Sequence, residues 1–89
     1  MANLLQITSA DINYQPEQLL DALLKLLNLK NDAALSKRLD IAPPVISKIR
    51  NRLLPVGSTL LIRMHEVSEI SIKDLRALMG DHRPRFFVG

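Results

Sequence analysis

The sequence has no cysteine, few aromatic residues and no long apolar run. Without cysteine the chain has no disulfide framework, no thiolate nucleophile and no cysteine-ligated metal or redox centre. Tyr14, Phe86 and Phe87 are its full set of aromatic residues, so it lacks a platform on which unpaired bases stack. Apolar runs such as Leu60–Ile62 are far shorter than the roughly 20 residues that span a bilayer, and the N-terminus has no basic segment of the signal-peptide kind. We therefore expect a protein without membrane contact.

The residues needed for catalysis or metal binding are equally scarce. His65 and His82 are isolated from each other and from cysteine, so they do not form a structural zinc site. The three glycines form no phosphate-binding loop, and no nucleophile lies beside a base. We expect no enzymatic activity, no metal and no other cofactor.

Charge is unevenly distributed along a chain whose 89 residues are enough for one domain. The whole chain carries a net charge of +3, but residues 37–52 alone hold five basic residues and one acidic residue, Asp40, a net charge of +4. Residues 1–29 hold three acidic residues and one basic residue. A basic segment on a nearly neutral body suits a polyanion such as duplex DNA, although an ordinary solvated surface explains the charge equally well.

Helical periodicity and helix-start residues predict an all-α domain of five helices. Asn31 and Ser71 are predicted caps, Pro43 is placed at a cap before Pro44, and Gly80 is a predicted stop. The predicted helices are residues 16–29, 32–39 and 44–52, a fourth capped by Ser58 or Thr59, and a fifth from 72 to Gly80. The predicted core positions are Leu19, Leu20, Leu23, Leu24, Leu26, Leu27, Leu35, Leu39, Ile46, Ile49, Leu61, Met64, Val67, Ile72, Leu75, Leu78 and Met79. Arg63 is expected to point away from this core.

The second and third predicted helices form a helix-turn-helix pattern. Ile46 and Ile49 face inward, which turns Pro44, Ser47, Lys48 and Asn51 outward as a small, polar face of the kind that enters a major groove. The stretch from Ala33 to Ile49 (AALSKRLDIAPPVISKI) resembles the helix-turn-helix of the lambda-repressor/Cro-like regulators, with a small Ser36 at the contact between helices.

The resemblance covers roughly residues 16–80, and "Ile-Ser-x-x-x-Leu" at 70–75 is similar to the family's fifth helix. It implies a compact five-helix DNA-binding domain at 15–80, between an N-terminal arm (1–14) and a basic, aromatic C-terminal tail (81–89). Three positions depart from the family pattern. Asp40 occupies the position where the family usually has a turn glycine, Ala42 the position of a serine or threonine, and Pro43 the position of a base-reading glutamine. Aspartate tolerates a left-handed backbone, whereas the missing glutamine implies a different target or more reading of DNA shape.

Site residues follow from the same resemblance, position by position. Lys48 is the strongest base-reading candidate because it can donate to guanine, and Val45 can touch a thymine methyl group. The residues at base-reading positions are Pro43, Pro44, Val45, Ser47, Lys48 and Asn51. The residues at phosphate positions are Asn31, Lys37, Arg50, Arg52 and Ser58.

The function expected from the resemblance is sequence-specific binding of double-stranded DNA by a small transcriptional regulator of phage or prokaryotic type. We expect a repressor in the cytoplasm, associated with the nucleoid, that acts as a homodimer on a pseudo-palindromic operator. Dimer or tail contacts are assigned to Phe86, Phe87 and Val88. The alternative is a DNA-binding antitoxin with a toxin partner, or a protein-interaction adaptor that keeps the helix-turn-helix as a scaffold.

Overall fold

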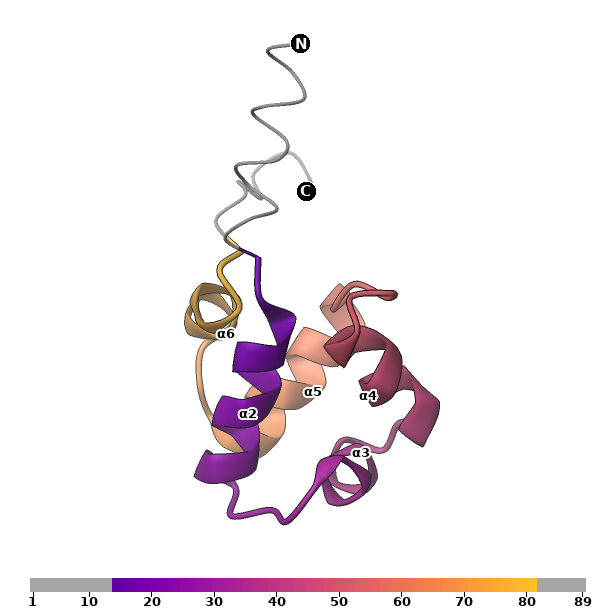
Figure 1. The fold of residues 1–89 in the computed structure, drawn as a ribbon. Coiled ribbons are helices and arrows are strands. Elements are labelled where there is room, and N and C mark those ends of the chain that lie inside the picture. The colour runs from indigo at the N-terminus through magenta and orange to yellow at the C-terminus, as the bar shows by residue number, and fades with distance from the viewer. Residues whose placement is uncertain (1–13, 82–89) are drawn as a thin grey trace, which may run out of the picture.

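Five helices connected by short turns make up residues 14–81, the part of the chain that the computed structural model describes (Figure 1). In chain order these are α2 (Pro16–Leu26), α3 (Asp32–Leu39), α4 (Pro43–Arg50), α5 (Ser58–Ser68) and α6 (Ile72–Leu78). No strand occurs in this range, which confirms the all-α prediction. Each of these helices is too short or too polar to cross a membrane. Apart from Tyr14 and Asp81, the predicted arm and tail lie outside the described residues, and so do Phe86, Phe87 and Val88.

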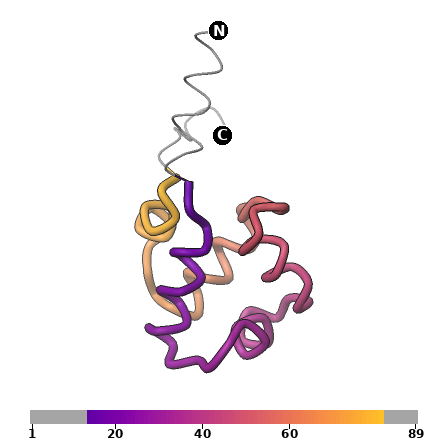
Figure 2. Tube along the Cα trace, viewed as in Figure 1, coloured from indigo at the N-terminus to yellow at the C-terminus, as the bar shows by residue number. Residues whose placement is uncertain are grey.

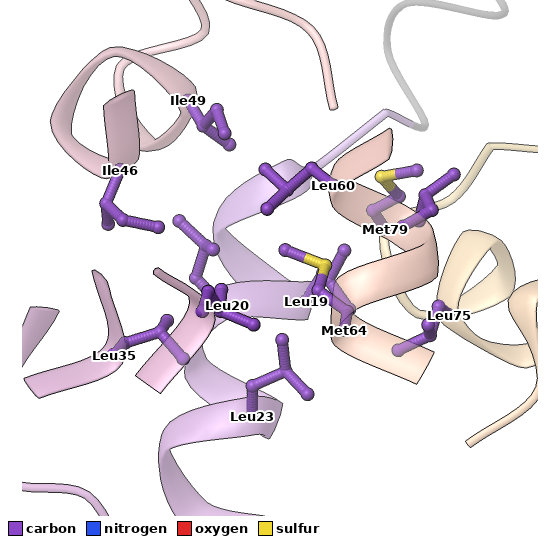
Figure 3. Packing of buried hydrophobic residues seen from close by; sticks show 12 residues of the cluster. Leu19, Leu20, Leu23, Leu35, Ile46, Ile49, Leu60, Met64, Leu75 and Met79 are labelled. Atoms are coloured by element: carbon purple, nitrogen blue, oxygen red, sulfur yellow. The ribbon is translucent and has the colours of Figure 1, made fainter. Parts of the chain in front are cut away.

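The core lies between the five helices, with α6 against α2 and α5 on one side and the α3–α4 pair on the other (Figures 1 and 2). Figure 3 shows the buried side chains of all five helices converging there. The buried apolar residues are Leu19, Leu20, Leu23, Leu35, Leu39, Ile46, Ile49, Leu60, Leu61, Met64, Leu75 and Met79. The backbone N–H of Gln15 donates to the carbonyl of Met79 at 2.7 Å, so the two ends of the described chain lie side by side.

Helix α2 begins as predicted at Pro16 but ends at Leu26, three residues before the predicted end. Asn28 adopts a left-handed conformation (φ 55°), and the N–H of Leu29 turns back to the carbonyl of Leu24. The prediction that Leu26 belongs to the core is also wrong, since 61% of its surface is exposed. Leu26 is the last residue of α2, and in Figure 1 α6 lies beside the N-terminal half of that helix.

Helices α3 and α4 have the predicted order, and both boundaries of α4 differ from the predicted range 44–52. Asn31 caps α3 as expected, its Oδ1 accepting from the N–H of Ala34 at 2.9 Å, and Asp40 takes the left-handed turn conformation (φ 57°, ψ 49°). Helix α4 starts at Pro43 rather than Pro44, with Ala42 as its cap, and ends at Arg50. Both prolines fit its first turn because the N–H groups there have no partner within the helix.

Helices α5 and α6 complete the domain. Gly57 caps α5, where Ser58 or Thr59 was expected, and Ser58 is the first helical residue. Ser71 caps α6 as predicted, with its Oγ accepting from the N–H of Asp74 at 3.0 Å, and Gly80 ends the segment with a φ of 74°. Leu78, a predicted core residue, is 39% exposed, whereas Leu75 in α6 and Met79 at its C-terminal cap are buried.

Candidate nucleic-acid interface

Helix α4 has one buried face and one exposed face. Ile46 and Ile49 are fully buried and hold the helix against α2 and α3. On the opposite face Pro43, Pro44, Ser47 and Lys48 are exposed, as the sequence pattern predicts. Val45 lies between the two faces and is half-buried against the core. The structure thus places four of the six predicted base-reading residues, Pro43, Pro44, Ser47 and Lys48, on one accessible surface.

Asn51 follows the end of α4 and turns back on it. Its Nδ2 donates to the carbonyl of Ser47 at 2.9 Å, and its backbone N–H donates to the same oxygen. Lys48 has no ion pair or hydrogen bond to any other described side chain. The ammonium group of Lys48 is therefore a hydrogen-bond donor on this face with no protein acceptor among residues 14–81.

The predicted phosphate residues fall into two groups. Lys37 and Ser58 are exposed, and within the described chain neither side chain has a hydrogen-bond or ion-pair partner. Asn31 is also exposed, but its Oδ1 is taken by the cap of α3. Arg50 and Arg52, by contrast, are held by carboxylates from other helices. Any phosphate contact of these two arginines has to compete with existing ion pairs.

Arg50 joins three helices through two aspartates. Its Nε and Nη2 donate to the two carboxylate oxygens of Asp32, at 2.8 and 2.9 Å, and its Nη1 donates to Asp21 at 2.9 Å. The hydrogen bonds to Asp32 are the main reason why the pKa of Arg50 is raised, and partial burial opposes them. A two-point contact with a planar carboxylate is the strongest geometry that an arginine offers. Arg50 therefore ties α4 to α2 and α3.

We expect the Arg50→Ala substitution to destabilise the domain by about 1 kcal/mol, the upper end for partly exposed ion pairs. The expected loss appears as a lower midpoint of urea denaturation, and it shrinks in about 1 M NaCl because salt screens the pairs. Arg38→Ala is the matched control: Arg38 is exposed on α3 without an ion pair in the described chain, so we expect a change below about 0.5 kcal/mol. Equal losses in both variants would contradict a structural role for Arg50.

Arg52 and Glu17 form a second link between the end of α4 and the start of α2. The Nη2 of Arg52 lies 2.6 Å from Oε2 of Glu17, and its Nε donates to Oε1 at 3.3 Å. The hydrogen bond from Arg52 is the main reason why the pKa of Glu17 lies below its usual value of 4.5. The charged form of Glu17 is thus favoured in the folded protein.

This pair predicts a pH dependence of stability. Because the folded-state pKa of Glu17 is lowered, the pair contributes fully above the ordinary pKa of glutamate, and the contribution is lost as the pH falls through the folded-state value. We expect Glu17→Gln to be less stable than the natural chain at about pH 7 and equally stable at about pH 2, in urea denaturation at both values. A difference that persists at the acid pH would show that the glutamate acts through something other than its charge.

The ion pairs of Arg50 and Arg52 change the distribution of positive charge that the sequence implies. At the C-terminal end of α4 the two guanidinium groups of Arg50 and Arg52 lie against three carboxylates, those of Glu17, Asp21 and Asp32. This corner is therefore not basic, although residues 37–52 are basic in sequence. The cations of that segment with no carboxylate partner among residues 14–81 are Lys37, Arg38 and Lys48, on α3 and the exposed face of α4.

A shallow hollow connects α3 to the start of α4. It has a volume of about 550 Å³, and Lys37 and Pro43 lie on its wall together with the turn residue Asp40. The hollow is otherwise lined by Ala33, Ala34, Ser36 and Ile41. A predicted phosphate residue and a predicted base-reading residue therefore share one continuous surface.

Sequence reasoning missed the part that Arg63 plays in holding this surface. Arg63 was expected only to point away from the core. Its Nη1 donates to the carbonyl of Asp40 at 2.6 Å and to that of Leu39 at 3.3 Å. It thereby ties α5 to the end of α3 and to the turn before α4. No local pattern in the sequence indicates this contact, which spans 23 and 24 residues.

Comparison with protein-family models, with curated proteins and with solved structures gave no match to this chain.

Proposed function

We propose that the chain is a sequence-specific, double-stranded DNA-binding regulator that reads the major groove with the exposed face of α4. In this proposal it is a transcriptional repressor of phage or prokaryotic type, acts as a homodimer and represses by covering a promoter. Repression follows from occupancy alone, so the activity requires neither a cofactor nor a catalytic residue.

The observation that carries the proposal is the two-faced geometry of α4. The helix follows α3 after a turn of three residues, its inner face is anchored by Ile46 and Ile49, and its outer face exposes none of the large apolar side chains that are exposed elsewhere in the described chain. A major groove about 12 Å wide admits a helix of this kind, provided that its outer side chains are small or can donate hydrogen bonds. Ser47 and Lys48 meet that requirement at the centre of the face.

The charges around this face support a polyanionic partner. Lys37 lies beside the start of α4, and Lys48 lies one turn further along the helix. Neither ammonium group has a carboxylate partner in the described chain, so both are available to phosphate oxygens or base acceptors. We assign the phosphate contacts to Lys37 and to its exposed neighbour Arg38. Arg50 and Arg52 are less suitable because their guanidinium groups are paired with carboxylates.

The test is selection of tight binders from a random pool of duplex DNA at about physiological salt, where nonspecific attraction is weakened. We expect an enriched pseudo-palindrome whose half-sites lie about ten base pairs apart, because a dimer places two reading helices about 34 Å apart. A single asymmetric site would keep the DNA-binding function and overturn the dimer.

If no motif is enriched, specific reading by this chain is wrong. The protein-interaction adaptor then takes its place, and the next measurement is a search for a protein partner that copurifies with the chain. Replacement of Lys48 separates the two classes, since an adaptor tolerates the substitution and a DNA reader does not.

A further inference from the structure

We infer that the first turn of α4 recognises thymine through its C5-methyl group, so that each half-site carries thymine within about two base pairs of a guanine bound by Lys48. The inference rests on the proposed function and specifies its DNA target. Pro43 and Pro44 are the residues that determine this preference.

The first turn of α4 presents an apolar surface with no polar side chain. Ala42, Pro43 and Pro44 are exposed, and Val45 is half-buried behind them. Further along the same face the exposed side chains become polar, at Ser47 and Lys48. The face is therefore divided into an apolar leading turn and a polar second turn.

The backbone of this turn has no hydrogen-bond donor to offer either. A helix start normally exposes several free N–H groups, which bind phosphates or base edges. Here the first two helical residues are prolines, which have no N–H, and the N–H of Val45 donates to the carbonyl of Ala42 at 3.0 Å. The first three positions of α4 are thus unable to donate a hydrogen bond to DNA.

An apolar turn without donors is selective in the major groove. All four bases present hydrogen-bonding groups there, including the O4 acceptor of thymine, and covering such a group without a partner costs about 1–3 kcal/mol, so a favourable contact has to come from an apolar group. The C5-methyl group of thymine is the apolar feature of the groove and gains from contact with proline rings.

The spacing of Pro44 and Lys48 along α4 sets the distance between the thymine and the guanine that they contact. Pro44 and Lys48 are four residues apart, which is about 6 Å along a helix axis. Successive bases of a DNA strand are separated by about 3.4 Å. A methyl group under the prolines and a guanine under Lys48 are therefore separated by about two base pairs.

The surrounding charges favour duplex DNA over an apolar protein surface as the occupant of this turn. Lys37 lies beside Pro43 on the wall of the same hollow, and Lys48 lies one turn beyond Pro44. Both ammonium groups lack a carboxylate partner in residues 14–81. An apolar patch bordered by unpaired cations complements methyl groups bordered by phosphates.

The test replaces thymine by uracil, one position at a time, in the duplex selected as described above. Uracil lacks the methyl group and keeps every hydrogen-bonding group of thymine. We expect affinity to fall roughly fourfold at one or two positions in each half-site, which corresponds to about 0.8 kcal/mol for one methyl group. In the Pro43→Ser, Pro44→Ser double variant this sensitivity is expected to disappear, whereas Lys48→Ala keeps it.

The outcomes separate the inference from the function on which it rests. If the natural chain binds its motif equally well with uracil at every position, or if the motif has no thymine near the guanine, the inference is wrong and the proposed function stands. If selection yields no motif, the proposed function is wrong and the inference fails with it. Because these arms use the natural chain, they do not depend on whether the proline variant folds.

Discussion

Replacing Leu23 by alanine is expected to lower the free energy of unfolding by about 2–5 kcal/mol. Leu23 is fully buried in α2, the helix that contacts α3, α4 and α6. Truncation removes buried methyl groups and leaves a cavity that the neighbouring helices fill only in part. A domain of about 70 residues has a total stability of about 4–10 kcal/mol, so this one change removes a large share of it.

Leu26→Ala is the matched control on the same helix. Both substitutions remove the same atoms and change helix propensity equally, but Leu26 is 61% exposed. We expect it to change the free energy of unfolding by less than about 0.5 kcal/mol. The measurement is urea denaturation followed by circular dichroism at 222 nm, a helix band. Similar losses in the two variants would mean that Leu26 is covered in solution, by another part of the chain or by a second molecule.

Replacing Lys48 by alanine is expected to cost about 1–3 kcal/mol of base discrimination, a factor of roughly 5–150 in relative affinity. The quantity to measure is the ratio of dissociation constants for the selected duplex and for the same duplex with its predicted guanine replaced. Lys48 is exposed and has no ion pair in the described chain, so its removal leaves thermal stability unchanged. A loss of discrimination without a loss of stability assigns the effect to the interface.

Lys73→Ala is the matched control for charge. Lys73 is exposed on α6, which lies across α2 and α5 from the α3–α4 pair (Figure 1). Removing its charge lowers affinity for all duplexes slightly and equally, because it changes only the long-range attraction to phosphates. If the two lysine variants weaken binding to the same extent and leave discrimination intact, Lys48 contributes charge alone and does not read a base.

Local sequence rules predicted the helix order and several helix ends. Asn31 and Ser71 cap their helices through hydrogen bonds to residues three positions away, and Asp40 and Gly80 take left-handed conformations where helices end. These features depend on a side chain and its close neighbours in sequence, so the residue types suffice to predict them. The exposed face of α4 was predictable for the same reason, because Ile46 and Ile49 fix the side that faces inward.

Helical periodicity predicted the burial of individual side chains less reliably than it predicted the helices themselves. Leu26 and Leu78 fit the apolar pattern of their helices, and both are exposed. The pattern gives the direction in which a side chain points, whereas burial also requires another helix to lie in that direction. Leu26 is the last residue of α2, and nothing in the sequence near Leu26 specifies which parts of the chain cover that end of the helix.

By itself, the sequence determined an all-α domain, the order of its helices, the caps Asn31 and Ser71, and the inner and outer faces of α4. Only the tertiary structure decided which charges of the basic segment are free. Arg50 and Arg52 reach carboxylates 18 to 35 residues away, and Arg63 reaches a turn more than 20 residues before it. Capping and periodicity act within one or two helical turns and can be derived from adjacent residues. An ion pair between helices depends on which helix ends meet, and the packing of the whole core determines that.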